Sequence, residues 1–315
     1  MLRLMASVIH EMWMDNDAEL LIMPGSIPMD VPTVRDELTR HLPEGWNALV
    51  DREVDGRSSI PFQKDQANQR YGARLAARRV ARTIMLGSAP TVRDQNVRGI
   101  EASRIRLGVV QPGENIANFN DALNTLTTSL AYLYATPTND RFWYDTRPTL
   151  RKTVEERATQ IAASDVEFEI ENRLRKLKKE APFAAVHICP ASSLDVPDEQ
   201  YARLVVLPPK DGYKASNPQN AAQTLAADIL NNRGNTPRIY INMLAFVAPD
   251  QELVNTMNHT ARVFLAWRSI QDDSEELNLD NSQNKEIEKN LAQFDRTVTD
   301  QLREAYCWLL VPGID

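Results

Sequence analysis

The stretch Arg70–Arg82, RYGARLAARRVAR, decides how the chain is organised. Arginine recurs in it every four residues, at Arg70, Arg74, Arg78 and Arg82. A step of four residues advances only roughly 40° beyond a full helical turn, so the four side chains share one face of a helix. The spacing predicts a helix from Arg70 to about Leu86 with a cationic face, Arg79 just beside that face, and Leu75, Val80 and Ile84 turned away from it.

This arginine ladder has no counterion nearby in the sequence. The formal net charge of the chain is -7, yet neither Asp nor Glu occurs between Asp65 and Asp94, so no carboxylate lies one turn away on the same helix. A solvated helix face is the simplest interpretation. The alternative is that the ladder points outward and binds the phosphates of nucleic acid or of a nucleotide, or an acidic protein surface. Replacing Arg74 and Arg78 by Ala should then leave the melting temperature nearly unchanged.

The residues after the ladder predict two more helices and a hairpin. Helical patterns cover residues 102–110 and 115–130, and half-buried strands are predicted at 131–135 and 141–145 on either side of the turn TPTND. Three helices followed by a hairpin is the order of a winged-helix domain, which we assign to residues 64–162.

The third helix of this expected winged helix lacks cations. Residues 114–140 contain no Lys or Arg, whereas phosphate contacts supply most of the affinity of such domains for DNA. Its asparagines have the chemistry to read adenine edges, but packing against protein is favoured over major-groove binding. Cations return in and after the second wing strand, where contacts with phosphate are predicted for Arg141, Arg147, Arg151 and Lys152.

The flanking segments predict two further units. Residues 1–63 read as an amphipathic helix, a short strand at residues 19–24 and a helix opened by Pro32. Residues 163–315 contain β-type runs at 183–188, 202–207 and 238–247, a helix at 220–232 and two long helices at the end. Strands that alternate with helices indicate an α/β module with a partly parallel sheet. The expected fold class is therefore mixed α+β and multidomain.

No catalytic or metal-binding motif is present in the sequence. The dipeptide Gly-Lys does not occur, so the phosphate loop of P-loop ATPases is missing. His187 and Cys189 lie two residues apart and would share a strand face, as a nucleophile and base or as half of a metal site, but a place in the core is the better prediction. Asp195, Asp198 and Glu199 are predicted to be solvated loop residues.

Composition limits the class of protein. With 43% hydrophobic residues and a pI near 5.3, the chain has an ordinary globular composition and no bulk attraction to nucleic acid or anionic membrane. The sequence has no continuous apolar run long enough for a membrane helix. Two cysteines form no disulfide framework, which indicates a reducing cytoplasm.

Several blocks together resemble a family of large bacterial and archaeal P-loop ATPases. The blocks are LRLMASVIHEMW, LLIMPGSIPMD, AARRVARTIMLGSAPT, RIRLGVVQPGE, RFWYDTRPTLRKTVEERA, RLVVLPP, LAWRSI and AYCWLLVP. The family is catalogued as domain of unknown function 499, an AAA-like group similar to the PglY-type ATPases of phage-resistance islands. The resemblance extends over essentially the whole chain.

The resemblance implies that the chain is similar to the C-terminal part of such an ATPase. Residues 1–63 would be a helical lid and Arg3 a nucleotide-sensing residue, while ATP and Mg²⁺ would bind to an N-terminal domain that precedes Met1. That domain, DNA and other defence-system proteins are the implied partners, and the protein could be an oligomer. ATPase activity is expected only together with that domain, and no cofactor is expected in this chain.

Three functions from different classes therefore remain. The first is an accessory region of a DNA-associated or anti-phage ATPase. The second is a stand-alone winged-helix nucleic-acid-binding protein with an α/β dimerisation domain. The third, least supported by the motif search, is an enzyme that uses the α/β half.

Overall fold

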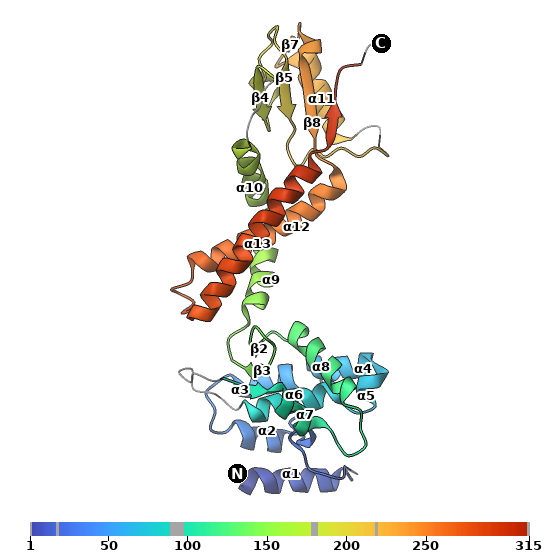
Figure 1. Ribbon diagram of the computed structural model, residues 1–315, viewed down its shortest axis with the longest axis vertical. Helices are drawn as coiled ribbons and strands as arrows, with labels where there is room; N and C mark the ends of the chain where they lie inside the picture. The colour runs from blue at the N-terminus through green and yellow to red at the C-terminus, as the bar shows by residue number, and fades with distance from the viewer. Residues whose placement is uncertain (1, 17–18, 89–97, 178–181, 218–219, 314–315) are drawn as a thin grey trace. The chain divides into compact units, whose positions relative to one another are not determined.

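The chain forms two compact units, Met1–Lys152 and Thr153–Asp315. A computed structural model describes residues 2–16, 19–88, 98–177, 182–217 and 220–313 (Figure 1). The fold is mixed α+β, and two long helices lie near the end of the chain, as the sequence predicts.

The first unit is mainly helical. Its elements are α1 (Leu2–Met14), α2 (Pro32–Thr39), α3 (Trp46–Leu49), a π-helical turn (Val50–Asp55), α4 (Ile60–Ala67), α5 (Gln69–Gly72), α6 (Ala76–Gly87), β1 (Ile100–Glu101), α7 (Ala102–Val109), α8 (Ile116–Ser129), β2 (Leu133–Ala135) and β3 (Arg141–Tyr144). The three strands form an antiparallel sheet in the order β1-β3-β2.

Helix α6 is the centre of this unit. Every residue from Ala76 to Met85 is buried, and α6 contacts α4, α7, α8 and strand β3. Residues of the segments 1–63 and 64–152 belong to a single hydrophobic core, which extends from Val8 in α1 to Tyr144 in β3. The helical segment at the start is therefore packed into the same unit as the arginine-bearing helix.

The second unit combines a sheet with helices on both faces. Its elements are α9 (Leu150–Gln160, which begins just before the boundary), α10 (Ala163–Lys176), β4 (Ala185–Ile188), β5 (Arg203–Val206), α11 (Ala221–Asn231), β6 (Asn232–Arg233), β7 (Thr236–Pro237), β8 (Leu244–Ala248), α12 (Gln251–Asp272), α13 (Asn281–Ala305) and β9 (Trp308–Leu310).

The main sheet of this unit has the order β4-β5-β8-β9. Strands β4, β5 and β8 are parallel, and β9 pairs antiparallel with β8, so the predicted partly parallel sheet is confirmed. Side chains of α10, α12 and α13 form one hydrophobic cluster with Ile188 and Val206. Side chains of α11 form a second cluster with Val205 and Phe246. The alternation of side chains along β5 thus places α11 on the opposite face of the sheet from the other three helices.

Two local predictions in the first unit are wrong. The predicted strand at residues 19–24 is not a strand, and Leu20, Leu21 and Ile22 are 75%, 50% and 47% exposed. The single helix predicted from Arg70 is divided into α5 and α6, because Leu75 has a φ of 49°, in the left-handed region. The carboxylate of Asp65 accepts the N–H groups of Ala77 and Arg78 and so caps the new start of α6.

Candidate functional site

The ladder arginines divide into an exposed pair and a buried group. Arg70 is exposed in α5, and the side chain of Arg74, at the turn before α6, is 62% exposed. Arg78, Arg79 and Arg82 lie inside the unit and are only 8%, 3% and 6% exposed. The prediction that the whole ladder points outward is therefore wrong.

Arg78 and Arg82 share one buried carboxylate. The Nε–H groups of both arginines donate to Asp55, each at 2.6 Å and each to a different oxygen. The carboxylate of Asp30 lies 3.1 Å from Arg78 and 3.4 Å from Arg82, and the N–H of Asp30 donates to Asp55 at 3.0 Å. Two guanidinium groups and two carboxylates thus neutralise one another between α6, the π-helical turn and the loop before α2.

The ionised state of this group follows from its geometry. Burial raises the pKa of Asp55, and the charges of Arg82 and Arg78 oppose that rise. Burial likewise acts to lower the pKa of Arg78, but the neighbouring Asp55 and Asp30 raise it. Because each oxygen of Asp55 accepts a charged N–H donor at 2.6 Å, the geometry favours an ionised carboxylate between two guanidinium groups.

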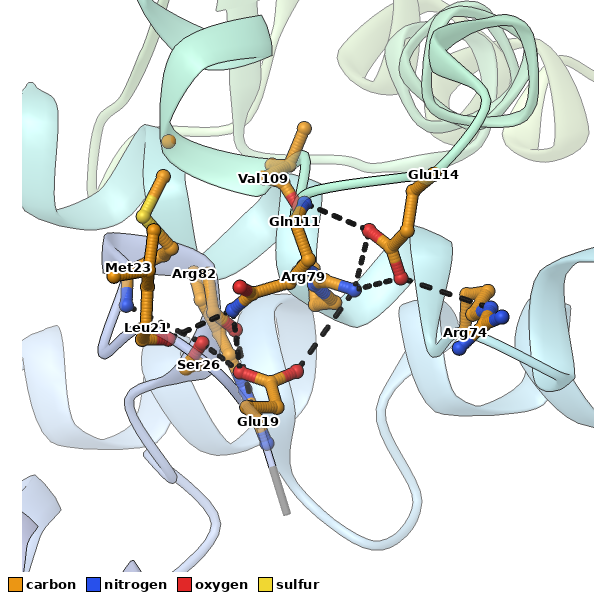
Figure 2. Close-up of polar contacts among 12 residues, drawn as sticks. Glu19, Leu21, Met23, Ser26, Arg74, Arg79, Arg82, Val109, Gln111 and Glu114 are labelled. Carbon is orange, nitrogen blue, oxygen red and sulfur yellow. Dashed lines mark hydrogen bonds and ion pairs between the residues drawn. The ribbon is translucent and has the colours of Figure 1, made fainter. Parts of the chain in front are cut away.

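Arg79 lies in a second group, drawn in Figure 2. Its Nη1 donates to both oxygens of Glu114 at 3.0 and 3.1 Å, and its Nη2 donates to the carbonyl of Val109. The carboxylate of Glu19 lies 3.8 Å from Arg79 and accepts hydrogen bonds from Ser26 and Gln111. This group ties the segment that follows α1 to α6 and to the loop between α7 and α8 (Figure 2).

The prediction that the ladder points outward failed because the carboxylates that pair with its arginines are distant in sequence. Asp30, Asp55 and Glu114 lie outside the interval from Asp65 to Asp94, and only the tertiary fold brings them to α6. Burial of a charge without such a partner costs much free energy, so the burial of the arginines requires the burial of these carboxylates beside them. Binding of phosphate or of a partner by the ladder stays a prediction, and Arg70 and Arg74 are the members that have exposed side chains for it.

The other predicted contact residues lie apart from this group. Arg3 is exposed on α1. Arg141 donates to the Gly99 carbonyl at 2.8 Å and to Glu101 at 2.6 Å, which fixes β3 to β1. Arg151 donates to the carbonyl of Leu130 at 2.9 Å, Arg147 is exposed, and Lys152 is half-buried. The structure does not bring these residues into one cationic surface with Arg78, Arg79 and Arg82.

In the second unit a pocket lies where the parallel strands end. Its volume is about 790 Å³, and it is bordered by Cys189 after β4, by Lys210 and Asp211 after β5, and by residues of α10 and α11. In parallel sheets the carboxyl edge is where ligands are usually bound. The predicted alternation of strands with helices, which indicates a parallel sheet, was the signal that could have indicated this pocket from the sequence.

His187 and Cys189 do not share a face. His187 lies in register with Val205, which belongs to the α11 cluster, whereas Cys189 packs with the α10, α12 and α13 cluster. The φ of 49° at Cys189 breaks the alternation of side chains along the strand. Burial, with the nearby charge of Glu171, raises the pKa of the Cys189 thiol to about 12, which is contrary to a role as a nucleophile.

Asp198 is more than a solvated loop residue. Its carboxylate accepts the N–H groups of Ile239 and Tyr240 at 2.8 and 3.0 Å, and the first of these bonds is the main cause that lowers its pKa. The neighbouring Arg238 is buried and donates to the carbonyls of Ile229, Pro197 and Val196. These hydrogen bonds hold the loop in place, so Asp198 has a structural role.

Comparisons of the chain with protein-family models, with curated proteins and with solved structures gave no match. Within the residues that the structure describes, no group of His, Cys, Asp and Glu side chains is arranged to hold a metal ion. In the same part of the chain, no helix has the length and apolar character needed to cross a membrane.

Proposed function

We propose that this chain is an accessory region of an AAA-like ATPase in DNA-associated or anti-phage defence, and that it works through protein contacts. The residue blocks that resemble the P-loop ATPase family, among them AARRVARTIMLGSAPT and RIRLGVVQPGE, support the link to an ATPase. ATP and Mg²⁺ would bind to another domain, because this chain has no Gly-Lys dipeptide and hence no phosphate loop.

The first unit supports a winged-helix assignment. Helix α6, strand β1, helices α7 and α8 and the β2–β3 hairpin follow one another in the chain order of that architecture, with the three strands in one antiparallel sheet. In DNA-binding members of this architecture the third helix enters the major groove. Helix α8 holds that place in the order.

The observation that carries the proposal is the chemistry of α8 and of the wing turn. Helix α8 contains no Lys or Arg, and its exposed residues include Asp121, Asn124 and Thr128. The turn between β2 and β3 has the sequence TPTND and contains Asp140 but no cation. The exposed Arg106 of α7 donates to Asn120 of α8 at 3.0 Å, but α8 and the turn supply no cation of their own for the release of counterions, which supplies most non-specific affinity for DNA. A protein partner fits this surface better.

Duplex binding tests the proposal. Fluorescence anisotropy of a labelled duplex of about 30 base pairs is measured with the full chain at 50 and 200 mM salt. A protein that contacts about 6 to 10 phosphates loses about 10³ to 10⁵ in affinity between these two salt concentrations. We expect weak binding without a steep salt dependence. Tight binding with a steep dependence would favour the stand-alone nucleic-acid-binding protein.

The link to an ATPase is tested separately. The reading frame upstream of Met1, or an adjacent gene, should encode a G-x-x-x-x-G-K-[ST] loop. A start codon with a ribosome-binding site at Met1, and no such gene beside it, would argue against this part of the proposal.

A further inference from the structure

The pocket at the carboxyl edge of the parallel sheet takes no part in the proposed function. Its volume of about 790 Å³ lies within the range of roughly 300–1,000 Å³ that small-molecule sites occupy. Helices α10 and α11 and the loops that follow β4 and β5 border it. The pocket lies wholly within the second unit, so a ligand bound there depends neither on the winged-helix assignment nor on the link to an ATPase.

The lining of this pocket is acidic. Its carboxylates are those of Glu167 and Glu171 in α10, Asp211 after β5 and Asp228 in α11. Among the described residues that line the pocket, Lys210 is the only cation, and Glu171 is also paired with Arg175 of its own helix. Two cations therefore balance two of the four carboxylates. The negative charge that remains indicates a cationic ligand.

Two of the carboxylates have no polar partner of their own. In the part of the chain that the structure describes, neither Glu167 nor Asp211 accepts a hydrogen bond or forms an ion pair, and both side chains are only partly exposed. Burial raises the pKa of Asp211; the charge of Lys210 opposes that rise, and the charge of Glu167 adds to it. The two carboxylates thus lie close enough to repel each other, and a bound cation would remove the cost of that repulsion.

The backbone that carries these carboxylates is well supported. Helix α10 buries three apolar side chains in the hydrophobic cluster that it forms with α12 and α13. In the loop after β5, the N–H of Asp211 donates to the carbonyl of Pro208 at 3.0 Å, and the N–H of Tyr213 donates to the carbonyl of Pro249 at 2.7 Å. The acidic side chains are therefore presented in a preorganised arrangement, which lowers the cost of binding.

The arrangement of the carboxylates determines the kind of cation. Within the described residues, no three His, Cys, Asp or Glu side chains are arranged to hold one metal ion, so the four carboxylates do not converge on a single point. A ligand that pairs with separated carboxylates needs separated positive charges. Between the charges the pocket has an apolar wall that suits methylene groups, formed by Pro190, Pro208, Pro209 and Leu225. An aliphatic chain with an ammonium group at each end has both properties.

We propose that the pocket binds an aliphatic diamine or polyamine, with its ammonium groups paired to Glu167 and Asp211 and its methylene chain against the prolines. Two ammonium groups match the two carboxylates that lack a partner. Amines of this kind keep their positive charge at pH 7, because the pKa of an alkylammonium group is about 10.

Isothermal titration calorimetry of the full chain at pH 7 and 50 mM salt tests the number of charges. The probes are 1,4-diaminobutane, spermidine and, as a monoamine of the same length as the first, 1-aminobutane. The diamine and spermidine should each bind at least about tenfold more tightly than the monoamine, because only they contact both carboxylates. Equal affinity for the three amines would overturn the proposal.

Substitutions test the place of binding. Asp211→Asn and Glu167→Gln should each weaken the binding of spermidine at least about fivefold, since each removes one charged contact. The matched controls Asp272→Asn and Glu288→Gln remove the same charges from exposed positions on α12 and α13 that do not line the pocket, and they should bind as the wild type does. An equal loss in the controls would show only a general attraction to the net charge of -7 and would refute the site.

A last titration distinguishes the free amine from a protein segment that carries the same ammonium groups. A blocked peptide of alternating Lys and Gly should bind more weakly than spermidine, because its backbone groups would lose water against the apolar wall. Tighter binding by the peptide, weakened by Asp211→Asn, would replace the small molecule with a basic protein partner and so overturn the proposal.

Discussion

Replacement of Arg78 by Met should destabilise the first unit strongly, whereas replacement of Arg74 by Met should not. Both substitutions keep an unbranched side chain and remove the guanidinium. Arg78 is 8% exposed, donates to Asp55 at 2.6 Å, lies 3.1 Å from Asp30, and is 5.5 Å from the ring of Phe62. The side chain of Arg74 is 62% exposed and lies 3.6 Å from Glu114.

The magnitude follows from what each substitution leaves behind. Without Arg78, the fully buried carboxylate of Asp55 keeps only Arg82 and one backbone N–H as donors. Removal of one partner of a buried ion pair costs about 3–5 kcal/mol, a large fraction of the roughly 5–15 kcal/mol that stabilises a domain. Because an exposed pair contributes about 1 kcal/mol or less, Arg74→Met should be nearly neutral. The expected decrease in Tm for Arg78→Met is about 6–20 °C.

Urea unfolding followed by tryptophan fluorescence gives the free energy of unfolding of each variant. Hydrogen exchange of the α6 amides shows whether the loss of stability lies in the first unit. The sequence pattern predicts instead that Arg74 and Arg78 behave alike. A difference between the two variants of less than 1 kcal/mol would refute the buried network.

Three further predictions concern titratable groups. The hydrogen bond from Trp308 is the main cause that lowers the pKa of Asp250, and the carboxylate of Asp250 also caps α12. Asp250→Ala should therefore lower the free energy of unfolding by about 1 kcal/mol at pH 7. This loss, measured by urea unfolding, should become smaller as the pH falls below about 4. Burial raises the pKa of Glu53, so the folded state binds its proton more tightly and the contribution of Glu53 to stability should fall as pH rises above about 4.3. In the same assay, the free energy of unfolding of the wild type minus that of Glu53→Gln should therefore decrease with rising pH. Iodoacetamide at pH 7.5 should label the exposed Cys307 at least tenfold faster than Cys189, as peptide mass spectrometry will show.

Elements with a strong local pattern could be predicted from the sequence. The strands β4 and β5 lie within the predicted β-type runs, β8 begins in the second half of the run at 238–247 and ends one residue beyond it, and α8 lies within the predicted helix at residues 115–130. Periodicity along a few turns or one strand carries this information, because burial on one face depends on local spacing. The parallel pairing of the strands followed from their alternation with helices.

The environment of the ladder could not be predicted in the same way. The pairing of Arg82 with Asp55 joins residues 27 positions apart, and that of Arg79 with Glu114 joins residues 35 positions apart. Pairs separated by this many residues produce no repeating pattern in the sequence, and charged residues are exposed in most proteins. The available signal was the composition of α6 itself, in which Ala76, Ala77 and Ala81 allow neighbouring elements to approach from several sides.

The burial of this network changes where recognition is expected. A buried ion-pair network adds little net stability compared with apolar residues, but it admits few alternative arrangements because every charge needs its partner. It joins α6 to the π-helical turn, to the loop before α2 and, through Arg79 and Glu19, to the segment after α1. The surface against which α1 packs is thereby held in one arrangement. Because Arg78, Arg79 and Arg82 are buried among their own carboxylates, any contact of the ladder with phosphate or with a partner is expected at the exposed Arg70 and Arg74.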